Sequence, residues 1–154
     1  MKVRDLVVAL VAVAATVSIA RAQSDPIVGT WKLNLAKSKY TVGAPKSATL
    51  VITAAGKGFK VSANAVLADG ASRKIEYTSM YDGMDAAVTG SPDYDTVAIK
   101  KTAEGSSGER KKAGKVVQTF TRNVSADGKT MTTTTKGTNA AGQKVDNVQV
   151  YDKQ

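Results

Sequence analysis

Apolar and polar residues alternate along most of the chain after residue 26, and no segment there shows a convincing 3.6-residue apolar period. Alternation with a period of two is typical of strands that bury one face. Gly-containing turns, many of them Asp-Gly, interrupt the alternation at short intervals and supply the positive φ angles that tight hairpins need. The pattern predicts ten short strands, at residues 28–36, 47–54, 58–67, 72–80, 84–89, 95–102, 108–113, 115–125, 129–136 and 143–153.

Ten strands joined by short turns form an up-and-down meander. An open row of strands would leave two exposed edges, and closing the row into a barrel removes them. The expected fold class is therefore all-β, as a single up-and-down antiparallel β-barrel of about 8–10 strands.

The faces expected to point inward carry few large apolar side chains. One face of the strand at 115–125 includes Gln118 and Arg122, and one face of the last strand includes Asn147 and Gln149. A packed core prefers Leu, Ile, Val and Phe, whereas a barrel lumen that holds water and a small molecule can be this polar. Two interpretations stay open: a lumen with space for a ligand, or a flattened barrel whose small side chains meet across the middle.

The first 22 residues differ in composition from the rest. Lys2 and Arg4 precede an apolar run at residues 6–20, and Ala20-Arg21-Ala22 follows. This order is typical of a cleaved secretory signal peptide, and the run is shorter than the roughly 20 residues of a membrane-spanning helix. We expect a signal peptide at 1–22 and one domain at 23–154. Small extracellular domains of animals are usually stabilised by disulfides, and this chain has no Cys. We therefore expect a periplasmic or secreted bacterial protein.

The composition also excludes several classes of site. Without Cys or His there is no thiolate nucleophile, zinc–thiolate site, Ser-His-Asp triad or His-ligated haem. A cluster of Asp residues between 82 and 95 matches no calcium-loop spacing and suits turns equally well. We expect no enzyme, no cofactor and no metal site.

The start and end of the domain resemble the calycin superfamily, which comprises the lipocalins and fatty-acid-binding proteins. Gly29-Thr30-Trp31-Lys32-Leu33 is similar to their Gly-x-Trp signature, and Tyr151-Asp152-Lys153 is similar to the final strand of fatty-acid-binding proteins. The chain also resembles small exported bacterial proteins described as lipocalin-like, without a settled function. The resemblance implies a barrel that Trp31 closes at one end. Residues 37–46 are too few for the two-helix lid of fatty-acid-binding proteins, so we expect no lid.

The same resemblance suggests a ligand site in the lumen. Fatty-acid-binding proteins hold a carboxylate with an Arg-x-Tyr on the last strand, where this chain has Gln149-Val150-Tyr151; Arg122 on a nearby strand is a candidate replacement for the missing Arg. Phe59, Tyr77, Phe120 and Met131 are expected to line the wall. The predicted ligand-binding residues are Trp31, Phe59, Tyr77, Phe120, Arg122, Met131, Gln149 and Tyr151.

The formal charge of +9 favours acidic partners, and six basic residues crowd the hairpin between Lys100 and Lys115. No aromatic residue lies in that hairpin to stack on bases, so nucleic acid is not expected. The leading hypothesis is an exported monomer that binds a small hydrophobic or amphipathic molecule in its lumen. The alternative is a non-enzymatic structural or interaction protein with a closed lumen, whose basic surface contacts an anionic envelope polymer or a lipid surface.

Overall fold

The structure is a computed structural model that describes residues 25–154. The predicted signal peptide at 1–22 lies outside the described residues. Within residues 25–154 no helix is both long enough and apolar enough to cross a membrane.

The described chain contains ten strands and one turn of 3-10 helix. In chain order they are β1 (Gly29–Leu33), η1 (Leu35–Lys37), β2 (Ser47–Ala55), β3 (Gly58–Val66), β4 (Ser72–Ser79), β5 (Asp82–Ala87), β6 (Thr96–Lys101), β7 (Gly105–Lys112), β8 (Lys115–Val124), β9 (Thr130–Thr138) and β10 (Lys144–Lys153).

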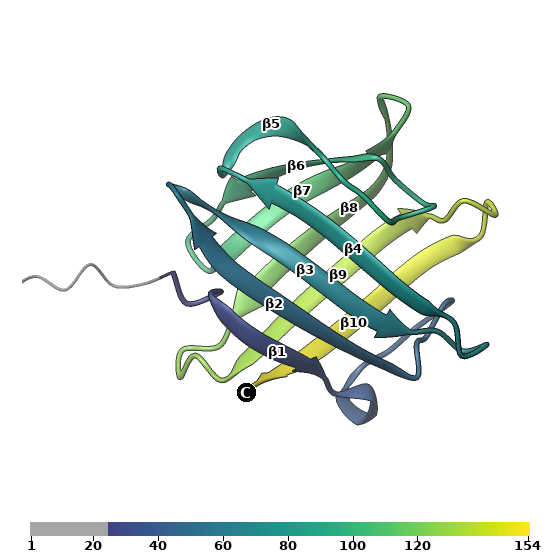
Figure 1. Cartoon of the computed structure of the whole chain (residues 1–154), viewed down its shortest axis with the longest axis horizontal. Coiled ribbons are helices and arrows are strands. Elements are labelled where there is room, and N and C mark those ends of the chain that lie inside the picture. Colours follow the sequence, from purple (N-terminus) through teal and green to yellow (C-terminus); the bar gives the residue numbers. More distant parts are fainter. Residues whose placement is uncertain (1–24) are drawn as a thin grey trace, which may run out of the picture.

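All ten strands belong to one antiparallel sheet with the order β4-β3-β2-β1-β10-β9-β8-β7-β6-β5. The first strand pairs with the last, with Trp31 opposite Lys153, and this pairing joins the two halves of the meander. In Figure 1 the strands β2–β4 cross over β8–β10, so the sheet folds back on itself. The predicted all-β, up-and-down barrel is confirmed.

The barrel is nearly, not fully, closed. Its two edge strands, β4 and β5, do not pair along their length; an isolated bridge joins Glu76 on β4 to Thr89, just after β5. Gly90 makes this approach possible, because its φ is +81° and the Lys74 carbonyl oxygen occupies the space that a Cβ would need. A side chain at position 90 would push the segment after β5 away from β4.

One end of the barrel holds the large apolar side chains. The Trp31, Phe59 and Met131 side chains are completely buried there. The indole Nε1 of Trp31 donates a hydrogen bond of 2.7 Å to the carbonyl of Ile27. Ile27 is itself 4% exposed, so the segment before β1 folds across this end and covers it. We call this end the base.

Asp25 holds the same segment in place. Its carboxylate accepts hydrogen bonds from the Tyr81 hydroxyl and the Lys101 ammonium, each at 3.0 Å, and from the Ile27 amide at 3.2 Å. Tyr81 in turn packs against Phe59, with ring centroids 4.7 Å apart and the ring planes inclined by 51°. The Asp25 contacts at the surface thereby help to hold the aromatic side chains of the base in place.

The predicted strand boundaries agree with the structure except at a few ends. The first strand stops at Leu33 instead of residue 36, because the Asn34 side chain accepts a hydrogen bond from the Lys37 amide and starts η1. The seventh strand begins at Gly105 instead of 108, since the small residues there pair with β8. The connection between β1 and β2 contains only η1, which confirms that two lid helices are absent within the described chain.

Candidate functional site

The half of the barrel away from the base encloses a cavity of about 220 Å³. The inward residues of β2 and β3 in this half are small or aliphatic, such as Ala48, Leu50, Val61 and Ala63, and they leave the middle unfilled. The opposite wall comes from β7–β10 and carries most of the polar groups. The structure therefore favours a lumen with space inside over one whose side chains meet across the middle.

Strand register sets the polar wall. Ser106 on β7 lies opposite Arg122 on β8, Arg122 lies opposite Thr133 on β9, and Thr133 lies opposite Gln149 on β10. Because side chains at paired positions point to the same face of a sheet, these four residues form one polar row across the inner wall. The Arg122, Thr133 and Gln149 side chains of this row line the cavity.

Arg122 is the central charge of the row and is only 4% exposed. Its Nη2 donates a hydrogen bond of 3.2 Å to the Tyr77 hydroxyl, on the opposite side of the barrel. Its Nε and Nη1 are buried and have no hydrogen-bond partner within residues 25–154. An Arg side chain stays charged at every physiological pH, so two donors of a permanent cation are left without an acceptor.

Neighbouring hydroxyls are unpaired as well. The Oγ1 atoms of Thr133 and Thr135 and the Oγ of Ser106 are buried without a hydrogen-bond partner in the described chain. Buried polar groups in folded proteins are normally paired, and exceptions cluster at sites where water or a ligand completes the network. The unpaired atoms here gather along one wall of the lumen.

Tyrosine hydroxyls complete the polar lining. Gln149 donates a hydrogen bond from Nε2 to the Tyr40 hydroxyl at 3.1 Å, which brings the loop before β2 against the last strand. Burial raises the pKa of Tyr40. Burial is also the main cause that raises the pKa of Tyr151, and the proximity of Tyr40 raises it further. Both hydroxyls are therefore neutral at pH 7 and can donate to an acceptor in the cavity.

The cavity has a second cation that the sequence analysis did not single out. Arg110 on β7 lines the same space, although the sequence shows it only as one of six basic residues between Lys100 and Lys115. The relevant signal was the alternation along β7: Ser106, Gly108 and Arg110 share the inward face, and Arg110 pairs with the inward Gln118 of β8. The other basic residues divide between faces, and the outward Lys111 forms an ion pair with Asp85 at 2.7 Å.

The structure places four of the eight predicted ligand-binding residues at the cavity, three in the base, and Phe120 in neither group. Tyr77, Arg122, Gln149 and Tyr151 come together around the cavity. Trp31, Phe59 and Met131 lie in the packed base and do not line the cavity, and Phe120 faces inward with its ring next to the two guanidinium groups. Sequence alternation predicts which face a residue takes but not which end of the barrel it occupies.

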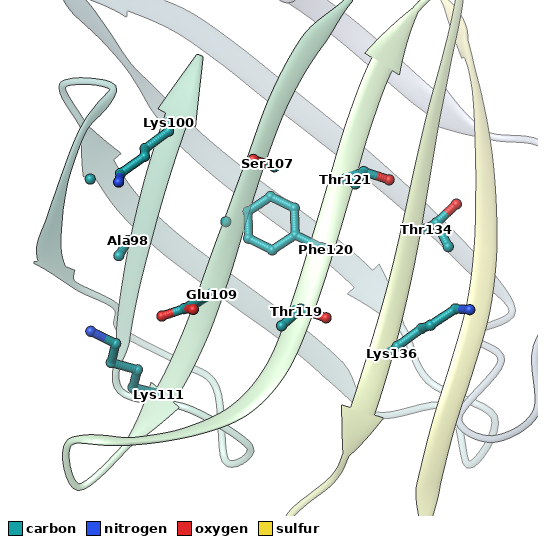
Figure 2. A pocket seen from close by; sticks show the side chains of 12 residues that line it. Ala98, Lys100, Ser107, Glu109, Lys111, Thr119, Phe120, Thr121, Thr134 and Lys136 are labelled. Carbon is teal, nitrogen blue, oxygen red and sulfur yellow. The ribbon is translucent and has the colours of Figure 1, made fainter. Parts of the chain in front are cut away.

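A larger hollow of about 650 Å³ lies on the outer face of β5–β9. Figure 2 shows its lining, where Thr119, Thr121, Thr134 and Lys136 project from β8 and β9. These residues alternate with the buried residues Gln118, Phe120 and Arg122 of β8. The Phe120 ring lies beside Gly108, which has no side chain to cover it, and therefore also lines this hollow. None of the buried unpaired groups along the inner wall lines this hollow, so the lumen is the stronger candidate site.

The aspartates between 82 and 95 have structural partners. Asp85 pairs with Lys111, Asp93 accepts from the Ala140 amide at 2.8 Å, and Asp95 accepts from the Ala113 amide at 3.0 Å. Within residues 25–154, no group of three or more acidic side chains is arranged to hold a metal ion.

The chain was compared with family models, with curated proteins and with solved structures. No family model and no curated protein matches the sequence. Among solved structures, the zebrafish ileal bile acid-binding protein, crystallised with cholic acid, matches at 13% identity with a TM-score of 0.40, over 84% of this chain and 99% of that chain. The nearly closed ten-strand barrel is the architecture that the Gly29-Thr30-Trp31 motif led us to expect.

Proposed function

We propose that the protein binds a small, partly apolar anion in the barrel lumen, with Arg122 as the anchor for the anionic group. The observation that carries this proposal is the buried Arg122 guanidinium, whose Nε and Nη1 lack partners beside a cavity. Leaving a buried charge uncompensated is costly in free energy. A carboxylate can accept two parallel hydrogen bonds from guanidinium donors and would remove that cost.

The rest of the lining suits the remainder of such a molecule. Leu50, Val61 and Ile75 supply apolar contacts on the wall opposite the polar row. Tyr151 and the Gln149–Tyr40 pair supply neutral donors and acceptors near the anchor. Apolar contacts on one wall and convergent polar groups on the other are what a small molecule with a polar end needs. The cavity also argues against the alternative of a structural protein with a closed lumen.

Binding is tested directly with a pair of probes that differ only in charge. Isothermal titration calorimetry would compare 4-methylbenzoate with its neutral analogue 4-methylbenzamide, on protein stripped of ligand by unfolding and refolding. We expect the acid to bind more tightly. Arg122→Met should weaken acid binding about 10- to 100-fold, because a hydrogen bond to a charged group contributes about 1.5–3 kcal/mol.

Lys136→Met is the matched control, since it removes one positive charge from the outer face. It should leave the affinity within about twofold, because an exposed charge there is screened from the lumen by water and salt. Equal binding of acid and amide, or equal losses from Arg122→Met and Lys136→Met, would refute Arg122 as the anchor.

We also propose that the domain acts outside the cytoplasm, because the composition of residues 1–22 is that of a signal peptide. Amino-terminal sequencing of protein recovered from the periplasm or medium of a bacterial host should begin at Gln23. Native mass spectrometry of the same sample, before and after denaturing extraction, would reveal a bound molecule and its mass. An uncleaved amino terminus in the cytoplasmic fraction would contradict the proposal.

A further inference from the structure

We infer that the lumen selects a short dianion, with Arg122 binding one anionic group and Arg110 binding the other. This inference rests on the proposed function and narrows the class of ligand. It comes from the second guanidinium in the cavity, from its distance to the first, and from the small volume between them.

Arg110 is held in place by contacts on two sides. Its Cζ lies 4.9 Å from the ring centroids of both Tyr94 and Phe120, so the guanidinium is stacked on two aromatic faces. Its Nη1 donates a hydrogen bond of 2.9 Å to the Gln118 side-chain carbonyl. The remaining N–H groups of the Arg110 guanidinium can donate to an acceptor. The contacts with the two rings fix the direction of these N–H groups before a ligand binds.

The two guanidinium groups are close together because they share Phe120. The Cζ of Arg122 lies 5.6 Å from the Phe120 centroid, and the Cζ of Arg110 lies 4.9 Å from the same point. Their separation therefore cannot exceed the sum of these two distances. A molecule with two anionic groups on a short rigid body can reach both.

The charge of the cavity is unbalanced. Among the described residues, its lining includes Arg110 and Arg122 but no Asp or Glu. Neither Arg takes part in any ion pair within residues 25–154. Aromatic faces and hydroxyls solvate a cation but carry no net charge, so both positive charges remain uncompensated. A monoanion neutralises one of them, whereas a dianion neutralises both.

The volume limits the length of the ligand. A cavity of about 220 Å³ is smaller than the pockets of roughly 300–1,000 Å³ that hold drug-sized molecules. The packed side chains of Trp31, Phe59 and Met131 block extension into the base. The site therefore fits a short aliphatic or single-ring dicarboxylate, and it is too small to bury a long-chain fatty acid completely.

The test uses acids that share a ring and differ in charge and spacing. Phthalate, isophthalate and terephthalate hold two carboxylates at three fixed separations, and each has a methylbenzoate counterpart with one carboxylate replaced by methyl. Calorimetry on the ligand-stripped, refolded protein should show at least one dicarboxylate binding tenfold or more tightly than its methylbenzoate counterpart. Palmitate should not compete with it.

Two variants of Arg110 identify the second anchor. Arg110→Met should abolish the preference for the dicarboxylate, so that the dicarboxylate and its methylbenzoate counterpart bind the variant with affinities within about threefold of each other. Arg110→Lys retains a charge and should retain part of the preference, even if the loss of stacking lowers stability. Circular dichroism would confirm that each variant is folded, and Lys136→Met again controls for the loss of one charge.

The outcomes separate the two proposals. If methylbenzoates bind and no dicarboxylate exceeds its counterpart, the dianion inference is wrong and the proposed anion site stands. A dicarboxylate preference that survives Arg110→Met would also overturn the role of Arg110. If neither class of acid binds to the folded, ligand-free protein, both proposals are wrong.

Discussion

Gly108 on β7 lies directly opposite Phe120 on β8, and the Phe120 ring occupies the space that a side chain at position 108 would need. A Cβ built at Gly108 would come within 2.8 Å of two ring carbons and within 2.5 Å of the Ala98 carbonyl oxygen. The missing side chain lets the ring lie between Arg110 and Arg122, within cation–π distance of both guanidinium groups.

Gly108→Ala should therefore destabilise the barrel by about 1–3 kcal/mol, as expected for overpacking a filled interior. Urea unfolding followed by tryptophan fluorescence would measure the change. Ser107→Ala is the control, because Ser107 is the outward-facing neighbour and its truncation should change the free energy of unfolding by less than about 0.5 kcal/mol. Similar effects of the two substitutions would show that the ring can move aside.

Arg122→Met should raise the stability of the ligand-free protein while it removes binding. Met fills a similar volume without a charge, and replacing buried charged groups by apolar ones has stabilised other proteins by about 1–4 kcal/mol. Such a trade between stability and function is common at binding sites. The midpoint of urea unfolding should rise for Arg122→Met, and a fall of more than about 1 kcal/mol would mean that the Tyr77 hydrogen bond outweighs the desolvation of the guanidinium.

Asp25→Asn should lower stability at neutral pH and have less effect in acid. Partial burial raises the pKa of Asp25, but the hydrogen bonds from Lys101, Ile27 and Tyr81 outweigh burial and lower it below the ordinary 3.8. A carboxylate whose pKa is lower in the folded state adds stability above its unfolded pKa, and that stability is lost as the pH falls through the folded pKa.

Urea unfolding of the wild type and Asp25→Asn at several pH values tests this. The difference in the free energy of unfolding between the two proteins should be about 1 kcal/mol or less at pH 7, because water screens the ion pair of Asp25 with Lys101. This difference should shrink below about pH 4. Asp69→Asn, at an exposed turn between β3 and β4, is the control. A difference for Asp25→Asn that is independent of pH would contradict the ionic contribution of this carboxylate.

Alkaline titration should reveal the buried tyrosines. Burial is the main cause that raises the pKa of Tyr40, Tyr81 and Tyr151, and the Asp25 carboxylate raises that of Tyr81 further. Groups whose pKa is raised in the folded state stabilise it below their unfolded pKa of about 10, and this stability is lost as the pH rises further. The free energy of unfolding should thus fall above pH 10.

Tyrosinate absorbance provides the measurement. In the native protein the absorbance should rise above pH 10 only in part, and the remainder should appear together with loss of the circular dichroism signal. The same titration in denaturant gives the reference curve. Coincident native and denatured curves, with the fold intact, would show that these hydroxyls are accessible to water.

Much of the barrel could be predicted because alternation is a local property. Gln118 and Arg122, predicted on one inward face of their strand, and Phe120 and Met131, predicted to line the wall, are all buried as expected. The errors at strand ends also have local causes, such as the Asn34 side chain that starts η1. Members of the polar inner row could thus be assigned to the inward faces of their own strands, but the sequence did not show that they lie side by side.

The sequence by itself determined the strands, the hairpin order and the side of the sheet to which each residue points, because these depend on neighbours within a few positions. Only the tertiary structure decided which end of the lumen each inward residue occupies. The position of Arg110 and Arg122 beside one cavity follows from the register of β7 with β8 and of β8 with β9. It also follows from the Phe120 ring, which both guanidinium groups contact. Pairing between whole strands and packing across the barrel create this proximity, so no local pattern contains it.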